Sequence, residues 1–278
     1  MQAQIERSGQ WKLHETPNYF VVSNEDDGGF IAEALERLEA IRKVFEEFYP
    51  PAMAERLRGD AARARQADLE IPAGAAPPEP TPPRTSVVRI CATSEQYHSY
   101  GGPPGTGGYF SAKSEELVLF DDQELRGRDA TWRALSHEAF HQYLHACFGE
   151  LRPHPWYNEG HGDFFGAFEY GRQRFRSTRS QERIRVVQDL IRSGRSVPLA
   201  EFVRWSKQEY YGANSLGLQT WECYAQGWSF VYFLRTGKQR ARGWQPAWDA
   251  ILDDYLPALV ATGDLALALE RALAGVDW

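Results

Sequence analysis

Short apolar runs bounded by turn-forming or charged residues predict three β-strands in the first half of the chain. These strands cover residues 19–23, 86–91 and 116–121. Between the first two strands, apolar positions recur every three or four residues over 31–48, which predicts an amphipathic helix. The proline pair at 50–51 ends this helix. Residues 52–70 are rich in Ala and Arg, and we expect them to be helical or partly ordered.

Proline and glycine interrupt this pattern at two places. The proline-rich stretch at 71–85 predicts an extended surface linker. Residues 101–108 are dense in glycine and predict either a mobile flap or a solvated hairpin loop. From about Arg128 onward the pattern is almost entirely helical. Its breaks fall near Arg152, Gly171, Ser193–Pro198, Gly212–Gly217 and Gly237.

A small mixed sheet with helices, followed by a mainly helical half, predicts an α+β fold. We place an N-terminal α/β subdomain at residues 1–127, including the linker at about 71–85. A helical subdomain follows at 128–278. We expect the two parts to fold together as one domain.

Composition limits the kinds of function that fit. At 278 residues, with 42% hydrophobic and 25% charged residues, the chain has an ordinary globular composition and can bury a large core. A net charge of −7 argues against a nucleic-acid partner, because phosphate binding relies on a positive surface. The three cysteines, at 91, 147 and 223, follow no ligand spacing, and we expect buried free thiols.

The sequence carries no sign of membrane insertion. No apolar run approaches the roughly 20 residues that a membrane-spanning helix needs, so we expect no transmembrane segment. The first six residues lack the basic start and the apolar stretch of a signal peptide. Export of a longer precursor that loses its leader stays open.

The segment His137-Glu138-Ala139-Phe140-His141 is where the sequence points to a specific chemistry. On a helix, residues four apart lie on one face, so both imidazoles can bind one ion. Glu138 is rotated by about 100° from that face, where it can hold a metal-bound water without being a ligand. Zinc is the expected ion, since neutral imidazole suits it and a catalytic zinc keeps three protein ligands and an open position.

A second predicted helix begins near Pro155 and carries Glu159 as the third ligand. The first helix should start with an N-cap at Asp129 and end at Gly149. The chain then has room to turn and return antiparallel, which brings Glu159 opposite the imidazoles. Asp163, one turn later, is placed to accept the free ring N–H of a metal-binding histidine. The alternative is two surface imidazoles and an unrelated carboxylate.

The two motifs together resemble the gluzincin zinc peptidases, the group of thermolysin and aminopeptidase N, and in particular their peptidase-MA-like family. The resemblance covers about residues 86–236 and implies a zincin-like fold. Tyr224-Ala-Gln-Gly227 is similar to the Tyr-x-Lys-Gly motif of the aminopeptidase N group, with Gln226 in place of Lys. By this resemblance Tyr224 steadies the oxyanion of the tetrahedral intermediate, and Tyr210 and Tyr211 are the alternatives.

The resemblance implies a zinc-dependent peptidase, with Zn²⁺ as cofactor and a peptide or protein as substrate, built as one catalytic domain. Glu138 would act as general base toward a water whose pKa zinc lowers from about 15.7 toward 7. No Gly-x-Met-Glu-Asn segment is present to hold a substrate's N-terminus, so we expect an endopeptidase. A zinc-bearing pseudopeptidase that only binds peptides, or a scaffold with a structural metal, are the alternatives.

In the group it resembles, the sheet's edge strand lies beside the zinc helix and pairs with an extended substrate. The resemblance therefore places peptide recognition by strand addition at residues 116–121.

Other histidines and a run of arginines have less specific explanations. His145 lies about 12 Å from His137 along the helix, too far to share an ion, so a structural or surface role is expected. His161 lies about 200° around the helix from Glu159, so we expect it to line the cleft or to support a ligand, and it is the fallback third ligand. A group of arginines is either a patch for acidic partners or a charged helix face. They are residues 172, 174, 176, 179, 183 and 185.

Overall fold

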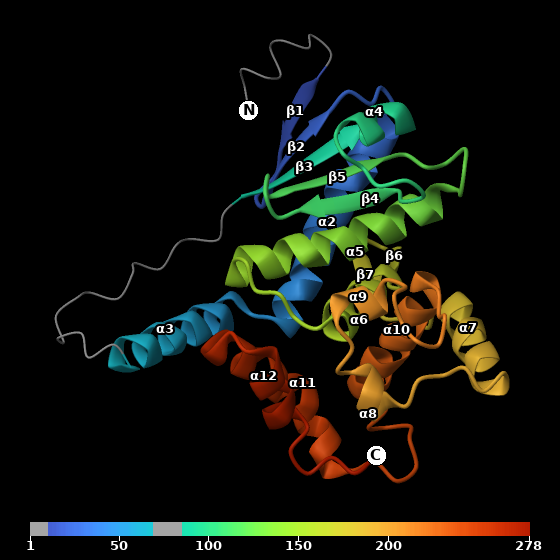
Figure 1. Cartoon of the computed structure of the whole chain (residues 1–278). Helices are drawn as coiled ribbons and strands as arrows, with labels where there is room; N and C mark the ends of the chain where they lie inside the picture. The colour runs from blue at the N-terminus through green and yellow to red at the C-terminus, as the bar shows by residue number, and fades with distance from the viewer. Residues whose placement is uncertain (1–10, 69–84) are drawn as a thin grey trace. The chain divides into compact units, whose positions relative to one another are not determined.

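The structure, a computed structural model, describes residues 11–68 and 85–278 and has a mixed α+β architecture (Figure 1). The expected α+β class is confirmed. The proline-rich linker lies almost entirely outside the described residues. The chain divides into two compact units. Among the described residues, the first comprises 11–51, 85–149 and 165–178, and the second comprises 52–68, 150–164 and 179–278.

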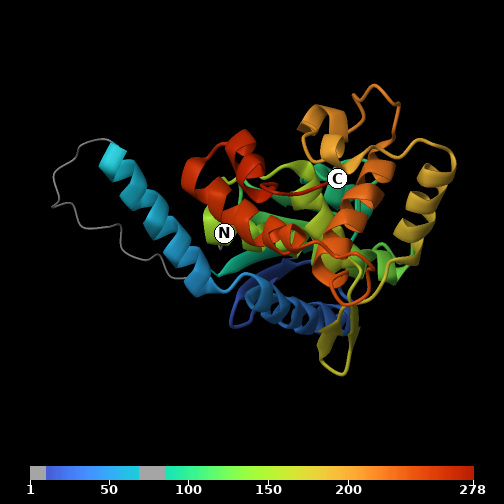
Figure 2. The ribbon, with the colours of Figure 1, turned by 90° about the horizontal axis from the view of Figure 1, so that it is seen from below.

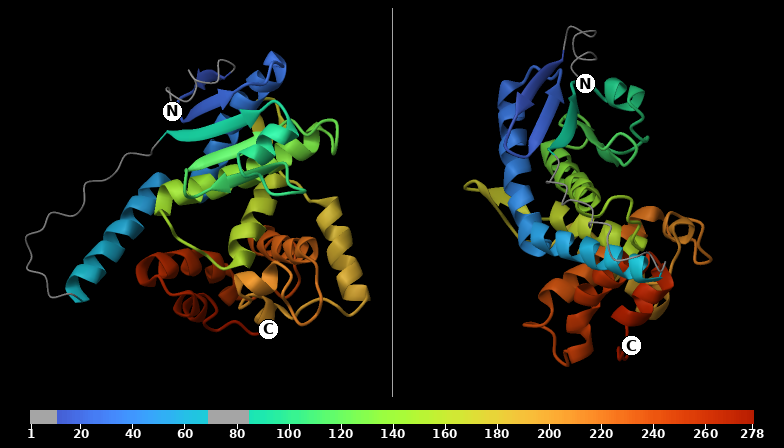
Figure 3. Two further views of the ribbon diagram at one scale, coloured as in Figure 1. Left: turned by 45° about the horizontal axis from the view of Figure 1, so that its top comes forward. Right: turned by 90° about the vertical axis from the view of Figure 1, so that its left-hand side faces the viewer.

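A five-stranded sheet forms the centre of the first unit (Figure 3). Its spatial order is β1-β2-β3-β5-β4. The strands β2 (Tyr19–Ser23), β3 (Ser86–Cys91) and β5 (Glu116–Phe120) are parallel and match the three predicted ones. The antiparallel strands β1 (Lys12–Glu15) and β4 (Gly108–Ser111) complete the two edges, and the sequence analysis missed both.

The expectation that residues 116–121 form the edge strand is wrong. Strand β5 pairs with β3 on one side and with β4 on the other, so its backbone groups are used within the sheet. The edge is β4, which follows the glycine-dense segment. Neighbouring β5 is apolar on both faces, as suits a strand inside a sheet covered by helices on both sides.

Two helical layers explain why both faces of β5 are apolar. Val118 and Phe120 pack on one face with Tyr97 of α4 (Ser94–Ser99). The long helices α2 (Gly28–Phe48) and α5 (Arg128–Phe148) pack against each other and against the sheet. Gly108, paired with Leu119, faces α5, so Leu119 lies on the α5 side of the sheet.

Helix α5 ends at the predicted residue but begins earlier than predicted. Gly127 occupies the N-cap position with no side-chain hydrogen bond, so the expected cap at Asp129 is wrong. Asp129 lies instead in the first turn, where its charge favours the helix dipole. Gly149, with a φ of 67°, is the C-cap as expected, because glycine adopts positive φ without strain.

The second unit is helical throughout its described residues, apart from loops. Its helices are α3 (Pro51–Asp68), α6 (Pro155–Gly166, whose last two residues belong to the first unit), α7 (Gln181–Arg192), α8 (Leu199–Phe202), α9 (Lys207–Tyr210), α10 (Thr220–Thr236), α11 (Pro246–Thr262) and α12 (Leu265–Ala272). Helices α11 and α12 pack together, as Figure 2 shows at the red end of the chain, and α10 packs against α7. None of the helices in the described ranges is both long and apolar enough to cross a membrane.

The predicted helical half contains one strand pair that the periodicity did not reveal. Strands β6 (Glu169–Gly171) and β7 (Arg174–Arg176) form a hairpin whose two turn residues, Arg172 and Gln173, both have positive φ. The arginines at 172, 174 and 176 are therefore exposed on this hairpin and do not share one helix face with the others.

Candidate metal centre

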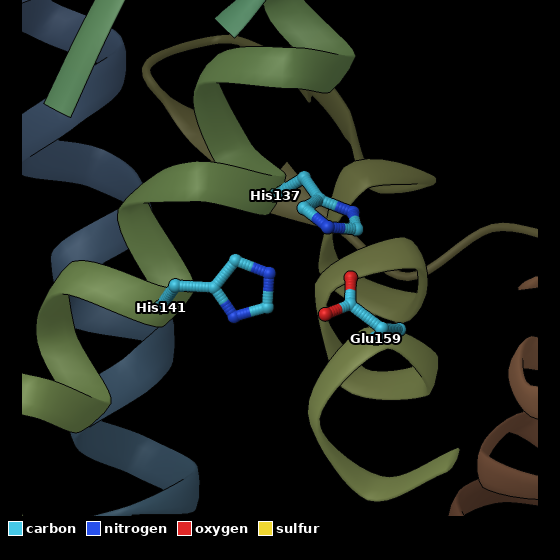
Figure 4. Close-up of side chains that lie close together, drawn as sticks. All are labelled: His137, His141 and Glu159. Carbon is cyan, nitrogen blue, oxygen red and sulfur yellow. The ribbon is translucent and has the colours of Figure 1, made fainter. Parts of the chain in front are cut away.

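Three side chains from two helices form a group that can hold a metal ion. His137 and His141 come from α5 and Glu159 comes from α6, and their potential ligand atoms all lie within 4.8 Å of one another. Figure 4 shows both imidazoles turned toward the carboxylate of Glu159. The structure thus brings together the three residues that the motif spacing predicted as ligands.

The donor set fits zinc. Two imidazoles and one carboxylate with an open position are a common catalytic zinc environment. Donor atoms around a tetrahedral zinc with bonds of about 2.1 Å are about 3.4 Å apart. The ligand atoms of the three side chains lie within 4.8 Å of one another, so binding an ion would draw them together by roughly an ångström.

Helix α5 presents the two imidazoles because residues on both sides of the histidine face are fixed by contacts within the first unit. Phe140 stacks near Phe45 and Phe165, with ring centroids 5.9 and 5.1 Å away. Gln142 donates to the carbonyl oxygens of Val87 and Glu115 at 2.8 and 3.0 Å. With these two flanks held, positions 137 and 141 lie together on the face between them, and their ring centroids are 4.7 Å apart.

Glu138 is held by the edge strand. Its Oε2 accepts a 2.9 Å hydrogen bond from the backbone N–H of Phe110 in β4. The strand lies close enough to α5 that only a small residue fits at position 108. A Cβ there would lie 3.4 Å from Glu138 Cγ and 3.5 Å from Ala134 Cβ. Glu138 does not belong to the group of potential ligands, as the helical geometry predicted.

The periodicity of α6 turns Glu159 toward α5. A Cβ placed on Gly166 would lie 3.2 Å from the carbonyl oxygen of Arg133 and 3.7 Å from His137 Cβ, so that face of α6 looks onto α5. Glu159 precedes Gly166 by seven residues, which is almost two full turns, and so shares its face.

The glycines of the two sequence motifs meet where α6 crosses α10. A Cβ on Gly160 would lie only 2.7 Å from the carbonyl oxygen of Gly227. A Cβ on Gly227 would lie 2.5 Å from the hydroxyl of Tyr210. Asn-Glu-Gly and Tyr-x-x-Gly therefore bring Glu159 and Tyr224 together through close backbone packing, because a larger residue at either glycine would separate the helices.

Two donors converge on one oxygen of Glu159. Its Oε1 accepts hydrogen bonds from the Tyr211 hydroxyl at 2.7 Å and from Asn158 Nδ2 at 3.1 Å. The side chain of Tyr224 is in turn hydrogen-bonded to Tyr211. Because Tyr211 gives its single proton to Glu159, Tyr224 is the donor in this second bond.

Tyr224 is partly buried near Glu159 and faces Tyr211. Burial raises the pKa of its phenol well above the ordinary value, and the negative charge of Glu159 and the neighbouring Tyr211 and Tyr210 raise it further. The phenol therefore stays protonated and can act as a donor. Its role toward an oxyanion stays a prediction. Tyr210 is fully buried against Gly227, which removes it as an alternative for contact with a substrate.

The residue at the Lys position of the Tyr-x-Lys-Gly motif has a packing role here. Gln226 is buried and pairs with both backbone groups of Val197. It accepts from the N–H at 3.1 Å and donates to the carbonyl at 2.7 Å. The amide thus fixes the segment before α8 to α10, which an ammonium group, having no acceptor, cannot do.

Asp163 forms an ion pair of 2.8 Å with Arg183 of α7. The guanidinium also donates to the backbone carbonyl of Trp221 at 3.4 Å and lies 5.8 Å from the Tyr224 ring centroid. Arg183 thus joins α7 to α6 and α10. The expectation that Asp163 also accepts an imidazole N–H stays a prediction.

The other histidines have structural partners. His161 is fully buried, and burial and Arg235 together lower its pKa well below the ordinary value. The neutral ring donates from Nδ1 to the carbonyl of Tyr157 at 2.7 Å and accepts at Nε2 from Arg235 at 3.1 Å. His145 Nε2 lies 3.7 Å from a carboxylate oxygen of Glu115. Neither ring belongs to the group of potential ligands.

Sequence reasoning missed the roles of Phe110 and Tyr211 at this site. Phe110 acts through its backbone, which no residue type reveals. Tyr211 was considered only as an alternative to Tyr224, since the Tyr-Tyr pair 210–211 carries no motif.

Neither the family models nor the curated proteins compared with this chain give a match.

Proposed function

We propose that this protein is a zinc-dependent endopeptidase of the gluzincin type, with a zincin-like fold. The observation that carries the proposal is the His137, His141 and Glu159 group, whose ligand atoms lie within 4.8 Å of one another beside a carboxylate that is not a ligand. A purely structural metal site does not need Glu138. Its hydrogen bond to the backbone of Phe110 supports a base held in a fixed position.

His137, His141 and Glu159 would hold the metal. When bound, zinc would polarise the carbonyl of the substrate and lower the pKa of the attacking water. Glu138 accepts the proton of the attacking water and passes it to the leaving amine. The hydrogen bond from the Phe110 N–H holds the Glu138 carboxylate in position throughout both proton transfers.

Tyr224 is the proposed donor to the developing oxyanion. Its hydroxyl is bonded to Tyr211 in the substrate-free protein. Turning toward a substrate exchanges that bond for one to the oxyanion, so the donor would act mainly in the transition state. A donor of this kind is typically worth about 3 to 4 kcal/mol of transition-state stabilisation.

Peptide recognition by strand addition is assigned to β4 in place of residues 116–121. An interior strand such as β5 has no unpaired backbone groups to offer, whereas β4 is the sheet edge next to Glu138. An extended peptide bound there would be a substrate held along several residues, which suits an endopeptidase.

The test combines metal analysis with a cleavage screen. The protein is loaded with zinc, dialysed and analysed for metal by mass spectrometry, and its products from a diverse peptide library are then identified. We expect one zinc per chain and cleavage of peptides at internal bonds. A chelator should stop this cleavage, and added zinc should restore it. Glu138→Gln should keep the zinc and lose at least ~100-fold in turnover.

Glu124→Gln is the matched control, since this exposed carboxylate is outside the site. It should cleave like the wild type. Zinc binding without cleavage of any peptide would overturn the peptidase proposal in favour of a peptide-binding module.

A further inference from the structure

The carboxylate of Glu159 is held in one orientation by two donors on the same oxygen. The Tyr211 hydroxyl lies 2.7 Å and Asn158 Nδ2 3.1 Å from Oε1. A carboxylate oxygen has two lone-pair positions, so these two hydrogen bonds fill the acceptor capacity of Oε1. A metal ion at that oxygen would have to displace one of them.

We propose that Tyr211 is a positioning residue that makes Glu159 bind the metal through Oε2 alone. The inference rests on the proposed metal centre and adds how its carboxylate ligand is set. Without Tyr211, the carboxylate can rotate and offer both oxygens to the ion. Hydrogen bonds that orient ligands in this way commonly change metal affinity by about 10- to 100-fold.

Tyr211 is itself fixed from several directions. Ser206 and Glu209 form a capping box that starts the short helix α9, and Tyr211 is the residue at its end. Gly212 follows with a φ of 117°, a conformation that favours glycine and sets the direction in which the chain leaves the helix.

The ring of Tyr211 also has contacts on two sides. The ammonium of Lys207 lies 5.7 Å from its centroid, and the side chain of Tyr224 is hydrogen-bonded to it. Tyr224 thus donates to Tyr211, and Tyr211 donates to Glu159, the proposed metal ligand. If Tyr224 turns to a substrate, the bond from Tyr211 to Glu159 stays in place, so the ligand keeps its orientation during catalysis.

The neighbouring Tyr210 provides a matched control. Its hydroxyl is buried and, among the described residues, has no hydrogen-bond partner. Removing it therefore changes one buried tyrosine without touching Glu159. Tyr211 is 38% exposed, so Tyr211→Phe leaves the core unaltered.

The experiment compares wild type, Tyr211→Phe and Tyr210→Phe in two measurements. Competition with a chromophoric chelator gives the zinc dissociation constant. The visible absorption of the cobalt(II) forms reports coordination number, because four-coordinate cobalt(II) absorbs more strongly than five- or six-coordinate cobalt(II). Thermal unfolding of the metal-free proteins checks that all three are folded.

Tyr211→Phe should bind zinc about 10- to 100-fold more weakly and show a weaker cobalt spectrum, as a carboxylate bound through both oxygens raises the coordination number. Tyr210→Phe should match the wild type in both. Unchanged affinity and an unchanged spectrum in Tyr211→Phe would overturn the inference while leaving the metal centre intact. Failure of the wild type itself to bind zinc would instead overturn the proposed function.

Discussion

The backbone N–H of Phe110 donates a 2.9 Å hydrogen bond to Oε2 of Glu138, and so ties the edge strand to the helix that carries both histidines. Gly108, two residues earlier, lies where the strand comes closest to α5 and leaves room only for a small side chain. A Cβ at Gly108 would meet its neighbours at 3.4 Å or more, which is ordinary contact, whereas a branched side chain has no such room.

Gly108→Val should therefore push β4 away from α5 and weaken the bond to Glu138. We expect peptide turnover to fall while zinc content stays at the wild-type level, and the free energy of unfolding to drop by about 1 to 3 kcal/mol. Gly108→Ala is the control and should keep most of the activity. Equal turnover in the Val and Ala variants would show that the approach of β4 does not matter.

His141→Ala should remove most of the bound zinc, because it deletes one of three protein ligands. His145→Ala should keep it, since that ring lies against Glu115 and outside the ligand group. Metal content after dialysis, measured by mass spectrometry on both variants, checks this. Zinc at the wild-type level in the His141 variant would remove the residue from the ligand set.

Tyr224→Phe should lower kcat by about 100-fold or more with little change in KM, because an oxyanion donor acts on charge that is present mainly in the transition state. The variant also frees the oxygen of Tyr211 from one hydrogen bond. Zinc affinity measured in parallel separates the two effects. If Tyr224 has a structural role alone, stability and activity should fall together, and kcat should not fall more than KM changes.

Gly160→Ala should destabilise the protein. The new Cβ would lie 2.7 Å from a backbone oxygen of Gly227, and backbone atoms cannot move away without shifting a helix. We expect a loss of about 1 to 3 kcal/mol in the free energy of unfolding. Denaturant titration measures it.

Gly59→Ala in α3 is the opposite case, as its Cβ meets only the flexible end of Arg63 at 3.6 Å. This variant should gain up to about 1 kcal/mol, because alanine is favoured over glycine inside a helix. A stabilised Gly160→Ala variant would contradict the close crossing of α6 and α10.

His154 should make stability depend on pH. Burial lowers the pKa of its imidazole to about 4, and Tyr255 accepts from its backbone N–H and bonds its Nδ1, both at 2.8 Å. Between pH of about 4 and 6.5 the unfolded chain binds a proton that the folded chain does not. The free energy of unfolding should therefore rise with pH in this window, by up to about 1.4 kcal/mol per pH unit from this group.

His154→Gln should show a correspondingly flatter profile in the same window. The comparison uses urea titrations of both proteins at one zinc concentration, so that contributions from the metal cancel. Parallel profiles would mean that His154 is protonated in the folded protein.

The sequence by itself determined those features that depend on neighbours within one or two helical turns. The period of residues 31–48 predicted α2, Gly149 predicted the end of α5, and the four-residue spacing of His137 and His141 predicted a shared face. Such features follow from backbone geometry, which is the same wherever the helix lies.

Only the tertiary structure decided which groups surround the ligands. Phe110 and Glu138 are 28 residues apart, and Tyr211 and Glu159 are 52 apart. The edge position of β4, the hairpin that carries Arg172 and the N-cap at Gly127 were likewise not predicted. Each depends on how distant segments pack, and strands of three or four residues are too short to be identified from their own pattern. The residue types of the proposed metal ligands are encoded locally, whereas contacts such as that of Tyr211 with Glu159 exist only once the chain has folded.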